Sequence, residues 1–167
     1  SAEMIKYANN SFLATKISFI NSLANICQKL PKTDIQTIAN AIGKDPRIGP
    51  LFLNAGPGFG GSCLPKDISA LLNFSKKIDD SHKILKAVLE INQEQPRKII
   101  NIIEDMGILK NKKTISILGV AFKKDTSDIR EATSIKLIEI LLQKKMNIKI
   151  HDPMAIENTR KIIGNKI

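Results

Sequence analysis

GPGFGGSCLPKD, from Gly56 to Asp67, is the stretch that decides most about this chain. Four of its twelve residues are glycine, which lets the backbone adopt left-handed angles and lets a ligand approach bare peptide groups. A proline follows Cys63 by two residues, where it suits the first turn of a helix, and the apolar residues after it recur at helical spacing. The stretch therefore predicts a glycine-rich loop that leads directly into a helix N-terminus.

Cys63 is the most reactive side chain expected in this stretch. It would lie at the helix N-terminus beside Lys66, where the helix dipole and an ammonium group both favour thiolate over thiol. Asp67 follows four residues later, so its carboxylate and the sulfur would share one side of the first turn. Most cysteines serve only in packing, and Cys27, among apolar residues at helical spacing, is expected to do so. The setting of Cys63 favours a nucleophile instead.

Helical periodicity extends to both sides of this stretch. Residues 2–30 contain no Gly or Pro and carry a broad apolar face, and further helical patterns flank Pro96, which is expected to kink a helix or start a new one. After the polar linker LKNKK, TISILGVAF predicts a buried parallel strand, SIKLIEILLQKK a helix and MNIKIHDP a second strand. We therefore expect a mainly α domain at residues 1–110. Residues 111–167 would begin a doubly wound, Rossmann-like α/β domain that is incomplete in this chain.

Composition and charge exclude several classes of protein. The formal net charge is +10, but the lysines are scattered, there is no Trp, and the single Tyr offers no aromatic platform, so a nucleic-acid partner is not expected. No apolar run is long enough for a membrane span. Two cysteines in different settings indicate a reducing cytoplasm. His82 and His151 lack companions at metal-ligand spacing, so no metal site is expected.

GFGGSCLPKD resembles the active-site cysteine signature of the UDP-glucose/GDP-mannose dehydrogenase family, most closely that of its members which oxidise UDP-glucose. The resemblance covers essentially the whole chain. It implies NAD-dependent oxidation of UDP-glucose to UDP-glucuronate in two hydride transfers, through a thiohemiacetal and a thioester on Cys63. GDP-mannose and a UDP-N-acetyl-hexosamine remain alternative substrates.

The same resemblance implies roles for residues outside the cysteine loop. AEMIKYANNSF matches the segment in which Lys6 and Asn10 face the reacting carbon and stabilise oxyanions, and Asp67 would orient or activate water. The residues implied to bind the nucleotide sugar are Arg47, Leu53, Phe59, Gly60, Phe122 and Lys123. Arg47 would reach across the interface of a homodimer formed by the central helical domain. Arg130 and Lys66 are implied to contact NAD.

One departure from the family pattern and two alternative functions stay open. The glycine fingerprint of an NAD-binding domain is absent, since only Gly119 follows the predicted strand, so the 167 residues alone are expected to be inactive and to bind NAD poorly. A cysteine hydrolase or transferase would need a histidine base for Cys63, either His82 or His151. The third reading is a dimerisation module with no chemistry of its own.

Overall fold

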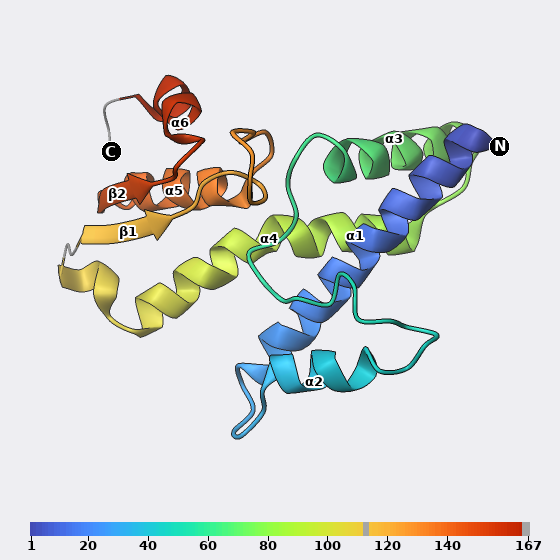
Figure 1. Ribbon diagram of the computed structural model, residues 1–167, viewed down its shortest axis with the longest axis horizontal. Coiled ribbons are helices and arrows are strands. Elements are labelled where there is room, and N and C mark those ends of the chain that lie inside the picture. Colours follow the sequence, from blue (N-terminus) through green and yellow to red (C-terminus); the bar gives the residue numbers. More distant parts are fainter. Residues whose placement is uncertain (112–113, 165–167) are drawn as a thin grey trace. The chain divides into compact units, whose positions relative to one another are not determined.

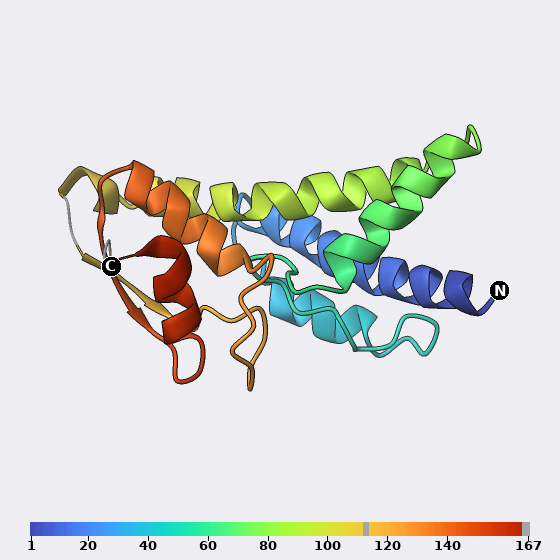
Figure 2. The ribbon, with the colours of Figure 1, turned by 90° about the horizontal axis from the view of Figure 1, so that it is seen from above.

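The computed structural model describes residues 1–111 and 114–164, and the chain divides into two compact units. The first unit contains Ser1–Gly58 and Cys63–Gln95, and the second contains Phe59–Ser62 and Pro96–Ile167. Helix α4 (Lys83–Asp105) belongs to both units and continues through Pro96, so the helix does not end there (Figure 2). The domain boundary expected at residues 110–111 stays a prediction, and the last two residues of the LKNKK linker lie outside the described residues.

The first unit is built on α1 (Ala2–Cys27), as Figure 1 shows. Helix α2 (Ile35–Ile42) packs on α1 through a core of Ile20, Ala39 and Leu53. Helix α3 (Leu64–Lys77) packs along α1 as well. The side of α1 buried by these neighbours carries many small or polar residues: Ser11, Ala14, Ser18, Asn21, Ala24. Because small side chains allow helices to approach closely, the Ser18 hydroxyl reaches α4 and donates to the Val88 carbonyl at 2.9 Å.

The second unit contains the strand–helix–strand arrangement that the sequence predicts. Strand β1 (Thr114–Leu118) pairs in parallel with β2 (Asn147–His151), and α5 (Thr133–Gln143) connects them; a 3-10 turn (Ile108–Asn111) precedes β1 and α6 (Ile156–Ile163) follows β2. Residues of α5 and α6 join Val120 and Ile148 in one core, with both helices beside the strands (Figure 2). The expected architecture, a helical domain followed by the beginning of an α/β domain, is confirmed.

One detail of the prediction for β1 is wrong. The apolar run TISILGVAF predicted a buried strand, but β1 ends at Leu118, whose side chain is 80% exposed, and alternate residues of β1 are exposed. The described residues form a sheet of only two strands, so one crossover cannot cover both of its faces. Val120, beyond the strand, is the residue of this run that is fully buried.

A buried carboxylate joins the ends of the two strands. Asp152 follows β2, is 8% exposed, and accepts hydrogen bonds from the backbone N–H groups of Val120 at 2.8 Å and Ala121 at 3.2 Å. It also accepts from Met154 at 2.8 Å and Ala155 at 2.7 Å. Burial alone raises the pKa of Asp152, but these four donors outweigh it and lower that pKa from 3.8 to about 2. The ionised carboxylate therefore stabilises the second unit.

The stability of the second unit should depend on the charge of Asp152. Because its folded pKa is lowered, this contribution is complete above pH 3.8 and disappears as the pH falls towards 2. Urea unfolding of the wild type should lose on the order of 2 kcal/mol through this group between pH 5 and pH 2. Asp152→Asn should be less stable at pH 5 and lose correspondingly less on acidification. An equal loss of unfolding free energy between pH 5 and pH 2 in the wild type and in Asp152→Asn would contradict this assignment.

Candidate active site

Two side chains of α1 converge on one carboxylate of α3. Asn10 Nδ2 donates to Asp67 Oδ2 at 2.6 Å, and Lys6 Nζ lies 3.5 Å from the same oxygen. Asp67 is 3% exposed, whereas the Lys6 side chain is largely open to solvent. The structure therefore brings together three of the four residues expected to be catalytic, with the carboxylate inside and the ammonium at the surface.

The arrangement satisfies a charge that would otherwise be costly to bury. An ionised carboxylate removed from water needs hydrogen bonds and an opposite charge, and Asn10 and Lys6 supply one of each. Since Lys6 and Asn10 are one helical turn apart, a straight α1 presents both to the first turn of α3. Their spacing in the sequence is sufficient to place them on one side, but it does not identify Asp67 as their shared partner.

Cys63 occupies the N-cap position of α3, as the sequence predicts, and its residue is exposed. Its carbonyl accepts the first helical hydrogen bond, from the Asp67 N–H at 2.9 Å, and Pro65 lies in the first turn. The partial positive charge of a helix N-terminus therefore acts at the position of this thiol. Cys27, by contrast, is buried in α1, which confirms its expected role in the core.

The position of His82 argues against a cysteine–histidine pair in the first unit. Cys63 precedes α3, while His82 follows its other end, and a helix of 14 residues is about 21 Å long. A base must lie within hydrogen-bond reach of the nucleophile or one water away. His82 is therefore excluded as the base for Cys63.

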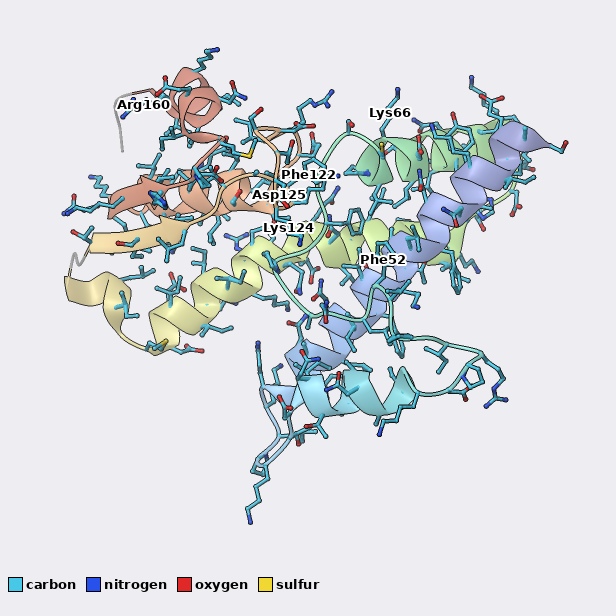
Figure 3. The ribbon with its side chains drawn as sticks, in the orientation of Figure 1. Phe52, Lys66, Phe122, Lys124, Asp125 and Arg160 are labelled. Carbon is cyan, nitrogen blue, oxygen red and sulfur yellow. The ribbon has the colours of Figure 1, made fainter. Side chains whose placement is uncertain are left out.

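The loop between α2 and α3 contains Arg47 and Leu53, both expected to bind the nucleotide sugar, and the two differ in exposure. The Arg47 guanidinium is exposed and binds the Asp45 carboxylate through Nε at 3.0 Å and Nη2 at 2.6 Å, which lowers the pKa of Asp45 and raises that of Arg47. Leu53 is buried in the core, so its backbone rather than its side chain is available to a ligand. In the same loop, Phe52 has a positive φ of 65° and a more exposed side chain, visible in Figure 3.

Two polar residues that the sequence analysis missed fix the end of this loop. The Gly56 N–H donates to Asn21 Oδ1 at 2.7 Å, and its carbonyl accepts from Gln95 Nε2 at 3.2 Å. Asn25 Nδ2 in turn donates to Gln95 Oε1 at 3.1 Å. Asn21 lies three helical turns after Asn10 on α1, a spacing that could have indicated a second inward-facing amide. These side chains hold the peptide just before the cysteine loop.

Within the second unit, Gly60 and Gly61 pack against the loop that follows β1. A Cβ atom on Gly60 would lie 2.4 Å from the Glu131 carbonyl oxygen, and one on Gly61, where φ is +80°, would lie 2.7 Å from the Phe122 ring. The Gly61 N–H donates to the Arg130 carbonyl at 2.8 Å. Phe59 is buried. Close contact with the Glu131 backbone therefore accounts for Gly60, and close contact with the Phe122 ring together with a positive φ accounts for Gly61, beside the ligand approach expected from the sequence.

The loop after β1 carries the remaining predicted residues. Phe122 is half-buried, Lys123 is exposed, and Lys123 Nζ lies 5.5 Å from the centroid of the Phe122 ring. Figure 3 shows Phe122, Lys124 and Asp125 together in this loop. The exposed Arg130 side chain binds Asp128 through Nε at 3.0 Å and Nη2 at 2.7 Å, and this pairing, with the Arg130 N–H, lowers the pKa of Asp128 to about 2.

Both candidate arginines stand two residues after an aspartate that holds them. Arg47 with Asp45 and Arg130 with Asp128 form the same pattern, in which the carboxylate also accepts the arginine's own backbone N–H at 2.9 Å. This Asp-x-Arg spacing is a local sequence signal that could have indicated both pairs. It fixes the backbone at each arginine while the guanidinium group remains at the surface.

The turn after β1 does not fit the usual cradle for NAD. In a dinucleotide-binding turn, backbone N–H groups after the first strand bind the pyrophosphate. Here the N–H groups of Val120 and Ala121 are bound to Asp152, and Gly119 donates to the His151 carbonyl at 2.8 Å. Lys66, which projects outward from the start of α3 in Figure 3, and Arg130 remain the candidates for contact with a cofactor.

Two absences hold within the described residues. Residues 1–111 and 114–164 contain no helix that is long and apolar enough to cross a membrane. Over the same residues, no group of three or more His, Cys, Asp or Glu side chains could hold a metal ion.

Comparison with protein families gives two matches along the chain. Residues 1–94 match the central domain of the UDP-glucose/GDP-mannose dehydrogenase family, and residues 116–167 match the UDP-binding domain of that family. A UDP-glucose 6-dehydrogenase of Bacillus subtilis is 47% identical over 100% of this chain and 36% of its own length. The UDP-glucose 6-dehydrogenase of Rickettsia felis is 45% identical over 99% of this chain and 37% of its own length.

Solved structures are similar over nearly the whole chain. A UDP-glucose dehydrogenase from Pyrobaculum islandicum aligns with a TM-score of 0.89 and 35% identity, over 98% of this chain and 38% of that one. The UDP-N-acetyl-mannosamine dehydrogenase of Staphylococcus aureus aligns with a TM-score of 0.74 and 27% identity, over 92% of this chain and 34% of that one. The chain thus spans little more than a third of the length of these relatives.

Removing the Asn10 amide should weaken the packing of α1 on α3. Asn10→Ala deprives the buried Asp67 carboxylate of a 2.6 Å donor, at a cost of about 1–2 kcal/mol in unfolding free energy after the higher helix propensity of alanine is allowed for. Asn40→Ala is the matched control and should cost nothing, because Asn40 is an exposed helical residue whose side-chain oxygen accepts from Gln36 within the same helix. Equal urea midpoints for the two variants would contradict the role of Asn10.

Proposed function

The chain belongs to the UDP-glucose/GDP-mannose dehydrogenase family, and from this membership we propose that it contributes the central and UDP-binding parts of an NAD-dependent UDP-glucose 6-dehydrogenase. The observation that carries the proposal is the convergence of Lys6 and Asn10 on the buried Asp67, one turn into the helix that begins at the exposed Cys63. A nucleophile, oxyanion donors and a carboxylate are the groups that this oxidation requires.

Cys63 is the proposed nucleophile. After the first oxidation of the sugar alcohol, its thiolate adds to the aldehyde carbon, and the carbonyl oxygen takes up the electron pair as the C–S bond forms. Loss of a hydride from the resulting thiohemiacetal gives a thioester, and attack by water releases the carboxylate and restores the thiolate. Each oxidation removes two electrons, so one sugar consumes two molecules of NAD.

Lys6 and Asn10 are proposed to stabilise the oxyanions that form in these steps. The ammonium of Lys6 is open to solvent and therefore accessible to a ligand, while the amide of Asn10 is oriented by its bond to Asp67. Asp67 is proposed to hold both groups in place and to orient or activate the attacking water. Preorganised donors are effective because they need no rearrangement when charge develops.

NAD is the proposed hydride acceptor. Since the N–H groups of Val120 and Ala121 are bound to Asp152 and not offered to a pyrophosphate, the proposed contacts of this chain with NAD come from the side chains of Lys66 and Arg130. The 167 residues alone are therefore expected to show no turnover.

Phe122 and Lys123 are proposed to bind the nucleotide sugar, with a contribution from the backbone of Leu53 to Gly60. Lys123 supplies an exposed positive charge suited to a diphosphate, and it follows β1 at the edge where ligands of α/β folds bind. UDP-glucose is the favoured sugar because the relatives that are 45–47% identical are named UDP-glucose 6-dehydrogenases. GDP-mannose and UDP-N-acetyl sugars are the alternatives to assay beside it.

A homodimer formed through α1 is the proposed assembly. Four large apolar residues recur every seventh position on α1 and are 52–68% exposed: Ile5, Phe12, Phe19, Ile26. Residues seven apart lie on nearly the same side of a helix, as in the seam of a coiled coil. A second copy would cover this stripe, and the exposed Arg47 could then reach the partner's substrate. Because Cys27 and Cys63 form no disulfide in the part of the chain that the structure describes, we propose that the enzyme works in the cytoplasm.

Replacing Cys63 should abolish acid formation. In the full-length protein that carries these residues, Cys63→Ser should lower UDP-glucuronate production from UDP-glucose and NAD by at least about a thousandfold, because a serine hydroxyl is not ionised at neutral pH. Cys27→Ser is the matched control and should retain turnover, since that thiol is buried in α1. Normal turnover by Cys63→Ser would favour the alternative of a dimerisation module without chemistry.

A charge within the α1 stripe should prevent dimer formation. Phe12→Glu would place a carboxylate in the proposed seam, and sedimentation equilibrium should show a monomer where the wild type is a dimer. Ile84→Glu, at an equally exposed apolar position on α4, should leave the dimer intact. A dimer that survives Phe12→Glu would refute the seam.

A further inference from the structure

The two carboxylate oxygens of Asp152 accept hydrogen bonds from different parts of the chain. Oδ1 accepts from Met154 and Ala155, two and three residues later, and so closes the local turn that enters α6. Oδ2 accepts from Val120 and Ala121, more than thirty residues earlier in the sequence. The local contacts are a common capping arrangement for aspartate, whereas the distant ones have no role in the turn itself. The bonds to Oδ2 instead hold the start of the loop after β1.

That loop leads directly to the proposed nucleotide-sugar residues. Val120 and Ala121 are followed by Phe122 and Lys123. The Val120 carbonyl is also held, because Ser134 Oγ donates to it at 2.6 Å. Both backbone groups of Val120 are thus fixed by side chains, and Val120 itself is fully buried. The Phe122 N–H donates to the Asp128 carbonyl at 3.1 Å, which closes the loop on itself.

The position of the Asp152 carboxylate is the one that a ligand phosphate takes in other α/β folds. There, successive N–H groups after the first strand point at a bound diphosphate. Here a buried anion of the protein satisfies the same groups permanently. The loop is therefore ordered before any ligand arrives, and binding need not supply that ordering.

We propose that Asp152 is a positioning residue for the nucleotide sugar: through the Val120 and Ala121 backbone it fixes Phe122 and Lys123 in advance of binding. The proposal rests on the proposed function, in which Phe122 and Lys123 contact the nucleotide sugar. Asp152 would act through the backbone, because both of its carboxylate oxygens accept from backbone N–H groups. Without its Oδ2, two N–H groups of a largely buried segment would lack a partner, and the loop would sample other conformations.

Asp152→Ser is the variant that keeps the local hydrogen bonds made by Oδ1 and removes the distant ones made by Oδ2. A serine hydroxyl can still accept from backbone N–H groups two or three residues later, but it is too short to span to Val120 and Ala121 as well. The matched control is Asp34→Ser, because Asp34 caps α2 through the N–H groups of Gln36 and Thr37 and has no such distant contact with any residue that the structure describes. Asp152→Asn, which keeps one acceptor, is the milder variant if Asp152→Ser does not fold.

In the full-length protein, Asp152→Ser should raise KM for UDP-glucose and Kd for UDP about tenfold while kcat changes less than about threefold, as for the loss of ground-state positioning. Amide hydrogen exchange at residues 120–123 should accelerate about tenfold or more. Asp152→Asn should show smaller changes in the same direction, and Asp34→Ser should change none of these quantities. A merely structural role would not raise KM selectively.

Two results would overturn the proposal: unchanged exchange at residues 120–123, or faster exchange with unchanged KM and Kd. Failure of the proposed function looks different, because the wild type would then not oxidise UDP-glucose at all. In that case UDP binding measured by calorimetry decides: weaker binding by Asp152→Ser with faster exchange supports the positioning role, and equal or absent binding in both proteins refutes it.

Discussion

The burial of the Asp67 carboxylate between α1 and α3 is the constraint on which the proposed active site depends. A charge that is 3% exposed must be met by specific partners, and Asn10 and Lys6 are the partners that α1 provides. This requirement fixes the rotation of α3 against α1, and α3 begins at Cys63. Stabilisation of one carboxylate thus places Cys63, the proposed nucleophile, at a fixed position relative to Lys6 and Asn10, the proposed oxyanion donors.

In the other unit, a second buried carboxylate is likewise satisfied by specific hydrogen-bond donors. Asp152 is satisfied by backbone N–H groups rather than by side chains, and it orders a loop instead of a helix. Both aspartates join segments that are distant in the sequence, and each sits next to residues proposed to handle the substrate. In both places a satisfied internal charge provides rigidity before a ligand is bound, which is the condition for preorganised binding and catalysis.

Local features of the site could be predicted from the sequence because they depend on near neighbours. Pro65 and the apolar spacing after it are sufficient for a helix that starts at Cys63, and the four-residue spacing of Lys6 and Asn10 is sufficient for a shared side of α1. The strand–helix–strand order of the second unit follows from the change in hydrophobic period. The proposed roles of these residues come from family membership.

Long-range features could not be predicted, since periodicity carries no information about partners far along the chain. The packing of Gly61 against Phe122 joins residues 61 positions apart, and the bond from Asp152 to Val120 spans 32. Leu53 and Phe59 lie in the loop between α2 and α3, as expected, but both are buried, which the Gly- and Pro-rich composition of this loop did not indicate. The exposure of Leu118 follows from the two-stranded sheet of the described residues, in line with the expected incomplete α/β domain, whereas the hydrophobicity of the TISILGVAF run alone suggested burial.

The covalent state of Cys63 during turnover tests the central claim most directly. The full-length protein would be mixed with UDP-glucose and NAD, quenched in acid within a single turnover, digested and analysed by mass spectrometry. The account predicts a transient acyl adduct of the nucleotide sugar on the peptide that contains Cys63, lost on treatment with hydroxylamine. Rapid formation of UDP-glucuronate with Cys63 unmodified at every time point, or with the adduct on another residue, would contradict it.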